Sequence, residues 1–213
     1  SVFNNNGFGV RGDLGAVVKA ILLDDEARPS IHTEIDGKLK EPLLRLTQLW
    51  RAYGAASQID DFSREPYSYI LGQGPLQASH VFNFFSPFFA PAGEIRNLGL
   101  VAPELQIVTE YQNTLVTNSF FSFTFYWNSA WTDPEEDAVL IDISEEIDIA
   151  DETDLMVDMV VGKLLGGSIS DTLRVEVVNM VELSQTAYPD NPALWVSEAI
   201  YFVVTSPEFA YQR

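Results

Sequence analysis

Apolar side chains recur at intervals of three and four residues over most of this chain, a spacing typical of amphipathic helices. Asp13 is a favourable N-cap, and the apolar positions that follow it predict a first helix. Pro42 is expected in the first turn of a second helix, and Asn191 with Pro192 opens the last long helix. The predicted helices cover residues 14–23, 42–53, 76–85, 103–121, 153–165, a stretch that begins at Ser170, and residues 192–205.

The segments between these helices are punctuated by glycine and proline, which predicts long ordered loops over 54–75 and 87–99. The apolar run at 138–143 predicts a short strand, and alternation at 121, 123 and 125 suits an extended segment. The predicted fold class is therefore all-α: an irregular multi-helix domain with at most one short strand or hairpin near 120–145. The pattern favours a single helical domain over residues 1–213.

The charge is strongly negative and unevenly placed. The 213 residues include 12 Lys and Arg against 31 Asp and Glu, a net charge of −19. Residues 1–97 carry nine basic and eleven acidic side chains, and residues 98–213 carry three and twenty. Such a chain is repelled by nucleic acid and by anionic membranes. No apolar run approaches the roughly 18–20 residues of a membrane span, and the absence of cysteine excludes disulfides and thiolate chemistry.

The segment 78–106 is the most specific local feature of the sequence. It contains five phenylalanines within residues 82–89, and no simple periodicity accounts for them. The candidate catalytic residues here are His80, Arg96 and Glu104. His80 could act as a general base or a ligand, and an arginine close to carboxylates could bind an acidic ligand or assist acid–base chemistry. The alternative is structural: a histidine that bonds the loop, and an ion pair that pins it.

Twelve acidic side chains lie between residues 133 and 158 with no Lys or Arg among them. This density suits a hard cation such as Ca²⁺, although the spacing fails the EF-hand pattern because no glycine occupies the sixth loop position. The alternative is a solvated acidic face. The candidate Ca²⁺ ligands are Asp142, Glu145, Glu146, Asp148, Asp151 and Asp154.

Aromatic residues gather between 120 and 131. Packing in the core or against a partner is the expected role of these side chains, and a sugar-binding surface is the alternative. The residues assigned to this interaction surface are Phe121, Phe123, Phe125, Trp127 and Trp131. The sequence contains no nucleophile elbow, phosphate-binding glycine loop, His-Glu-x-x-His motif or dinucleotide fingerprint.

Three groups of motifs resemble one known family. They are residues 2–28 (VFNNNGFGVRGDLGAVVKAILLDDEAR), residues 40–45 (KEPLLR) with 71–75 (LGQGP) and 79–87 (SHVFNFFSP), and residues 204–209 (VTSPEF). Together they resemble the C-terminal part of the bacterial family called domain of unknown function 1800.

The resemblance implies a mostly helical, exported bacterial protein whose full-length members are longer, so we expect an N-terminal half outside this chain. It also implies a partner, since members are commonly encoded beside an exported protein of alkaline phosphatase–sulfatase-like fold. The family supplies no agreed catalytic residues and no established cofactor.

Three functional hypotheses follow. The first is an exported helical module with a structural or protein-interaction role, with Ca²⁺ as a possible ligand of its acidic segment. The second is part of a hydrolase that acts on extracellular polymer, with a cleft near His80 and Glu104. The third is a carbohydrate-binding surface on the aromatic residues of 120–131.

Overall fold

The computed structural model describes residues 1–28, 37–57, 59, 62, 67–126 and 138–212. These residues form two compact units, Ser1–Gly37 and Lys38–Gln212. We call them the N-terminal unit and the main unit and describe each by itself.

The N-terminal unit consists of an asparagine-rich turn followed by helix α1 (Leu14–Leu22). The side-chain oxygens of Asn5 and Asn6 accept hydrogen bonds from backbone amides of residues 7–10. Asp13 caps the helix by accepting from the amide of Ala16 at 3.0 Å, and Asn6 donates to its second oxygen at 2.7 Å. The predicted N-cap is therefore confirmed, and its carboxylate is also tied to the preceding turn.

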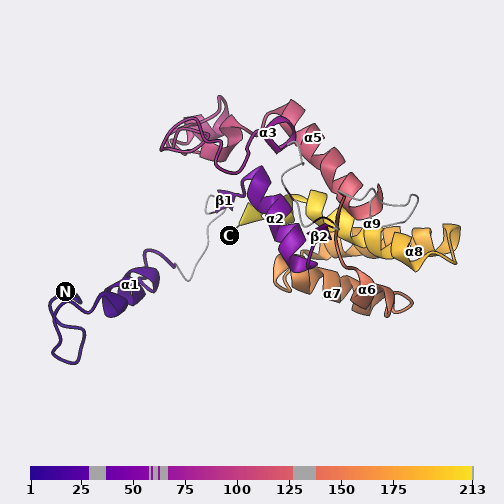
Figure 1. Ribbon diagram of the computed structural model, residues 1–213, viewed down its shortest axis with the longest axis horizontal. Coiled ribbons are helices and arrows are strands. Elements are labelled where there is room, and N and C mark those ends of the chain that lie inside the picture. The colour runs from indigo at the N-terminus through magenta and orange to yellow at the C-terminus, as the bar shows by residue number, and fades with distance from the viewer. Residues whose placement is uncertain (29–36, 58, 60–61, 63–66, 127–137, 213) are drawn as a thin grey trace. The chain divides into compact units, whose positions relative to one another are not determined.

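The main unit is built from helices joined by long loops (Figure 1), and its described residues also form four two-residue strands. Its longer helices are α2 (Pro42–Ala52), α5 (Glu110–Phe121), α7 (Thr153–Leu165), α8 (Asp171–Ala187) and α9 (Pro192–Thr205). The shorter ones are α3 (Tyr67–Ile70), α4 (Glu94–Asn97), α6 (Ser144–Ile147), α10 (Pro207–Ala210), a 3₁₀ turn at Pro103–Gln106 and a π-helical turn at Ser122–Tyr126.

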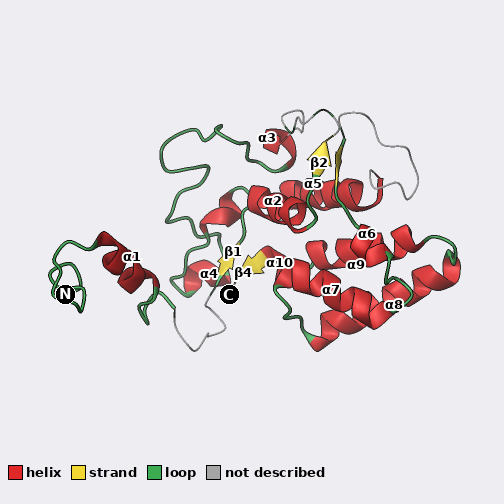
Figure 2. Cartoon of the chain, turned by 60° about the horizontal axis from the view of Figure 1, so that its bottom comes forward, coloured by secondary structure: helices red, strands yellow, loops and turns green. Residues whose placement is uncertain are grey.

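Helix α9 lies at the centre of the main unit. Eight of its fourteen residues are buried, among them Trp195, Ile200 and Val203. Helices α7 and α8 pack beside it, as both views show (Figure 2). Leu49 of α2 and Val160 of α7 belong to the same buried core. A helix that is apolar on nearly all sides is stable only inside such a core, which explains why α9 is surrounded.

The strands form two small antiparallel pairs. Strand β1 (Lys38–Leu39) pairs with β4 (Tyr211–Gln212), which joins the two ends of the main unit. Strand β2 (Ala56–Ser57) pairs with β3 (Val139–Leu140). The sequence predicted one short strand or hairpin near 120–145; β3 lies there, and the other three strands lie elsewhere.

The mainly helical fold is confirmed. Helix α7 ends at Gly166, which adopts φ +70° and so the left-handed conformation that favours glycine. One predicted helix and one predicted boundary were wrong. Residues 76–85 form turns rather than a helix, and α5 begins at Glu110, after the N-cap Thr109, rather than at Pro103. The alternation at 121, 123 and 125 belongs to the end of α5 and the π-helical turn, not to a strand.

The prediction of a single helical domain that is the C-terminal portion of a longer protein stays a prediction. Within the described ranges, no helix combines the length and apolarity that a membrane crossing requires.

Candidate functional site

The motifs at 40–45 and 71–75 meet at the N-terminus of α2. The side chain of Gln73 is buried, and its oxygen accepts the amide hydrogen of Leu43 at 3.1 Å. Its nitrogen donates to the carboxylate of Glu41. The first amides of a helix lack partners within the helix, so Gln73 supplies from a distant loop the cap that Glu41 does not provide.

Arg45 links α2 to the motif at 204–209. It is a buried arginine that donates to the carbonyl oxygen of Val204 at 3.3 Å, and its guanidinium lies 5.3 Å from the ring centroid of Phe120. Burial lowers the pKa of Arg45 to about 10. Because the described residues place no carboxylate at ion-pair distance from it, the carbonyl and the aromatic ring hold this cation.

The motif at 204–209 forms the turn from α9 into α10. Ser206 donates to the carbonyl oxygen of Val203 at 2.7 Å and accepts from the amide of Phe209 at 3.2 Å, so it caps α10. The carboxylate of Glu208 accepts hydrogen bonds from the amide and hydroxyl of Ser170, the N-cap of α8. The ring of Phe209 is fully buried. The motif at 40–45 is therefore linked by hydrogen bonds both to the motif at 71–75 and to the motif at 204–209.

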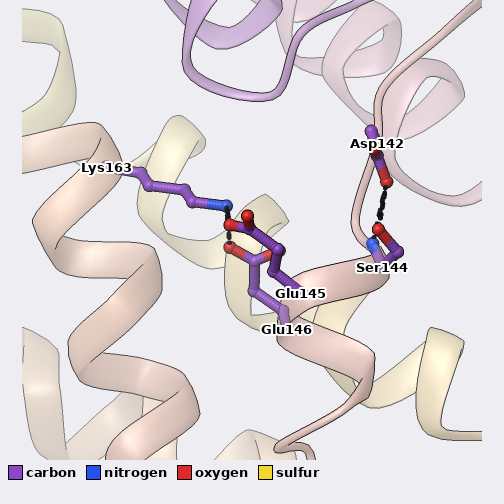
Figure 3. A network of polar contacts seen from close by, with 5 residues as sticks. All are labelled: Asp142, Ser144, Glu145, Glu146 and Lys163. Carbon is purple, nitrogen blue, oxygen red and sulfur yellow. Dashed lines mark hydrogen bonds and ion pairs between the residues drawn. The ribbon is translucent and has the colours of Figure 1, made fainter.

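A second polar centre lies between α6 and α7 (Figure 3). The ammonium of Lys163 lies 2.7 Å from Glu146 Oε1 and 2.9 Å from Glu145 Oε2. Glu146 is fully buried, whereas Glu145 is exposed. No other donor among the described residues reaches the Glu146 carboxylate. Burial alone lowers the pKa of Lys163, but its contacts with Glu146 and Glu145 outweigh that effect and raise it. Lys163 is thus the cationic partner of a fully buried carboxylate.

Tyr53 completes this centre. Its ring lies 5.0 Å from the ammonium of Lys163, and its buried hydroxyl has no hydrogen-bond partner among the described residues. Burial, together with the negative charge of Glu146, raises the pKa of Tyr53 well above 10.0.

We expect Tyr53→Phe to stabilise the protein by about 1 kcal/mol at pH 7, because it removes an unpaired buried hydroxyl. A raised pKa means that the unfolded tyrosine loses its proton first, so the stability of the wild type falls as the pH rises above about 10. The variant lacks this contribution and should lose less stability. Urea unfolding of the wild type and the variant at pH 7 and above pH 10 measures the stabilisation and its pH dependence. A variant less stable than the wild type at pH 7 would show that the hydroxyl has a partner.

The candidate Ca²⁺ ligands are mostly engaged by the protein itself. Asp142 accepts hydrogen bonds from the amide and hydroxyl of Ser144, which lower the pKa of Asp142. Glu145 and Glu146 bind Lys163, Asp154 binds Arg174 at 2.9 Å, and Asp148 and Asp151 are exposed. In the part of the chain that the structure describes, no three His, Cys, Asp or Glu side chains form a group that could hold a metal ion. Residues 133–137 of the acidic segment lie outside the described residues.

The candidate catalytic residues have separate partners. His80 is exposed, and its Nδ1 accepts from the amide of Phe82 at 3.2 Å. Arg96 donates to the carbonyl oxygen of Ala90 through both Nε and Nη2. Glu104 is buried and lies 3.5 Å from the ammonium of Lys38. Each of these contacts fixes a loop or a chain segment, and no contact joins two of the three residues.

The predicted aromatic surface is divided between the core and the undescribed part of the chain. Phe123 and Phe125 are buried, and Phe121 is half-buried against the ring of Tyr201, with centroids 5.8 Å apart. Trp127 and Trp131 lie outside the described residues. The described aromatics therefore pack inside the main unit.

In the main unit, a stretch without charged residues carries several strongly exposed apolar side chains. Residues 66–93 contain no Asp, Glu, Lys or Arg. Leu76, Val81, Phe82 and Phe88 are 105%, 94%, 70% and 84% exposed, and the other three phenylalanines of residues 82–89 are only half-buried. Leu98 and Val101 continue the exposed apolar positions. We call residues 76–101 the apolar segment.

Hydrogen bonds order the apolar segment. Ser86 donates its amide hydrogen to the side chain of Gln106 at 2.7 Å, and the amide of Ala102 donates to the carbonyl oxygen of Phe89 at 2.9 Å. Two residues of this segment other than glycine have positive φ, Leu76 at 60° and Asn83 at 77°. A positive φ strains the backbone of a residue with a side chain, and the strain is greater for leucine than for asparagine. Strained backbone conformations are concentrated at functional sites.

These observations define a mainly helical protein whose motifs build a scaffold around α2 and whose main unit carries strongly exposed apolar side chains on one ordered loop. The chain belongs to the family described as "Protein of unknown function (DUF1800)", whose model matches residues 1–211. A search of curated proteins and a search of solved structures found no match.

Proposed function

We propose that this protein is an exported bacterial module whose apolar segment docks a partner protein. The observation that carries the proposal is the exposure of Leu76, Val81, Phe82 and Phe88 in a stretch without charged residues. Ordered apolar side chains in water mark interaction sites, and depletion of charge with enrichment in aromatic residues is the composition of an interface core.

The charge distribution supports a protein partner over a lipid surface. The net charge of −19 opposes approach to an anionic bilayer, whereas the apolar segment lets a second protein make contact without burying a charge. The only charged side chains of the apolar segment are Glu94 and Arg96, and Arg96 donates its hydrogen bonds to the carbonyl oxygen of Ala90. A preformed loop also loses little entropy when it binds.

The partner that family membership favours is an exported protein of alkaline phosphatase–sulfatase-like fold, because family members are commonly encoded beside one. We expect Phe82→Ser and Phe88→Ser each to weaken its binding by about tenfold or more, because buried aromatic anchors dominate interface energies. Biolayer interferometry with the two purified proteins measures the effect. Tyr188→Ser removes a comparably exposed aromatic side chain after α8 and should leave the affinity unchanged.

Wild-type affinity in both phenylalanine variants would contradict docking through the apolar segment. Unchanged affinity is also expected if the apolar segment only stabilises its own loop. In that case each variant should have a lower melting temperature than the wild type, which a thermal melt measures. Hydrolase activity near His80 and Glu104, sugar binding by the aromatics of 120–131 and Ca²⁺ binding stay predictions.

A further inference from the structure

An open groove of about 490 Å³ runs along α2 in the main unit. Five of its lining residues follow one another at helical spacing on one face of α2, among them Gln48 and Arg51. Lys40, just before α2, Lys163 of α7 and Gln212 of β4 complete the lining. None of the described residues that line the groove is acidic or aromatic.

The side chain of Gln48 fixes the arrangement of the groove. Its oxygen accepts from the ammonium of Lys40 at 2.8 Å, and its nitrogen donates to the carbonyl oxygen of Leu164, the neighbour of Lys163, at 2.8 Å. Arg51 follows Gln48 by three residues on the helix, so their Cβ atoms lie about 5–6 Å apart. Three cationic residues, Lys40, Arg51 and Lys163, thus line the same groove as this immobilised amide.

Two of these three cations have no carboxylate partner among the described residues. Lys163 is held by Glu145 and Glu146, but no carboxylate among the described residues forms an ion pair with Lys40 or Arg51. The ammonium of Lys40 has the Gln48 oxygen and, at 4.4 Å, the ring of Phe209 as its neighbours. Burial lowers the pKa of Lys40, and the charge of Arg45 lowers it further.

A local excess of positive charge is unexpected in a chain with 31 acidic and 12 basic residues. A structural ammonium that is half-buried usually has a carboxylate partner, and such partners are abundant here. In the described part of the chain, Lys40 and Arg51 instead have no carboxylate partner, and Gln48 holds the ammonium of Lys40 in place. An anion that lies between Lys40 and Arg51 would neutralise their positive charges. Because there are two positive charges, an anion with two negative charges matches them.

We propose that this groove binds a dianionic oxyanion, a phosphate or sulfate group, between Lys40 and Arg51. Lysine serves such a group as a point charge, and the planar guanidinium of arginine contacts two of its oxygens at once. The absence of aromatic side chains from the lining means that recognition is directed at the charged group. The proposal goes beyond the docking function, because none of the lining residues belongs to the apolar segment.

The test is an NMR titration of the whole chain at pH 7.5 with inorganic phosphate, sulfate, glycerol phosphate and acetate, at constant ionic strength. We expect saturable shifts of the Gln48 side-chain amide and the Arg51 backbone amide with the dianions, and affinity for acetate weaker by about tenfold or more. Tighter binding of glycerol phosphate than of phosphate would assign the site to an ester, and equal binding would assign it to the free ion.

Charge variants separate this site from general attraction of anions. Lys40→Gln and Arg51→Gln should each weaken phosphate binding by about tenfold, whereas Lys40→Arg retains it. Arg174→Gln removes the same charge from a pair with Asp154 and Asp158 outside the groove and should change affinity less than about twofold. Loss of affinity in Arg174→Gln equal to that in Arg51→Gln, or no saturable shift with any dianion, would overturn the proposal. Arg51 is exposed, so its variant keeps the fold.

Discussion

Replacement of Lys163 by methionine should lower the free energy of unfolding by about 3 kcal/mol or more, because it leaves the fully buried carboxylate of Glu146 without its cation. Glu146 has no other donor among the described residues, so nothing in its surroundings compensates for the loss. Methionine retains much of the lysine stem, so the effect reports on the charge rather than on packing. Urea unfolding at pH 7 measures it.

Two further variants test this explanation. In the Lys163→Met, Glu146→Leu double variant the buried charge is absent, so we expect most of the lost stability to return. Arg174→Met breaks ion pairs with Asp154 and Asp158, whose side chains are 83% and 62% exposed, and should cost about 1 kcal/mol or less. If Lys163→Met and Arg174→Met cost the same, the Lys163–Glu146 pair is not the buried structural contact described above.

The sequence predicted the long helices because their signals are local. Helix α9 begins at the expected Asn191–Pro192 pair and ends at Thr205, and the side chain of Asn191 caps it as predicted. Helix α7 has buried residues at the expected helical spacing and ends at the expected glycine. Caps, proline positions and periodicity all depend on neighbours within a few residues, so they can be found without knowledge of the fold.

The elements that were predicted incorrectly depend on distant contacts. Residues 76–85 carry apolar side chains that suggested a helix, yet they form turns with Leu76 and Asn83 at positive φ. No local signal announces that a leucine adopts this conformation. Strands β1 and β4 are two residues long and lie about 170 positions apart in the sequence, so a period-two pattern has no room to develop.

The candidate site was predicted only in part, because closeness in sequence does not determine contact. Arg96 and Glu104 looked like an ion pair, but Arg96 binds a carbonyl of its own loop and Glu104 binds Lys38. The pairing of Lys163 with a carboxylate could have been predicted from one feature of the sequence: Lys163 is the only Lys or Arg between Arg96 and Arg174. A lone cation among many carboxylates is expected to be paired. The burial of Gln73 had no comparable signal, because this residue lies between two glycines in a predicted loop. Arg45 lies among leucines, but its partners, the carbonyl of Val204 and the ring of Phe120, come from distant parts of the chain.

The partners of Arg45 and Gln73 explain why the motifs of this family contain polar residues at buried positions. Gln73 caps α2, and Arg45 crosses to the end of α9, so the polar groups of these motifs hold the scaffold in one arrangement. Lys40 belongs to the same motif as Arg45 but has its ammonium in the groove. The motif therefore supplies one cation to the core and one to the surface that we propose as an oxyanion site.

Phe209→Ala should be as damaging as the loss of Lys163, with an expected cost of about 4 kcal/mol, because it empties a fully buried site at the end of the α9–α10 turn. The ring packs edge-on against Phe120, with centroids 6.2 Å apart, and lies under the ammonium of Lys40. Phe209→Leu retains most of the volume and should cost about 1.5 kcal/mol. Denaturant unfolding of both variants gives the comparison.

Phe88→Ala provides the matched control, since it removes the same side chain from a position that is 84% exposed. A substitution there should change the free energy of unfolding by less than about 0.5 kcal/mol. The two phenylalanines then separate the two roles: Phe209 maintains the fold, and Phe88 is expected to affect partner binding alone. If Phe88→Ala destabilised the protein as much as Phe209→Ala, the apolar segment would be part of the core in solution, and the docking proposal would lose its basis.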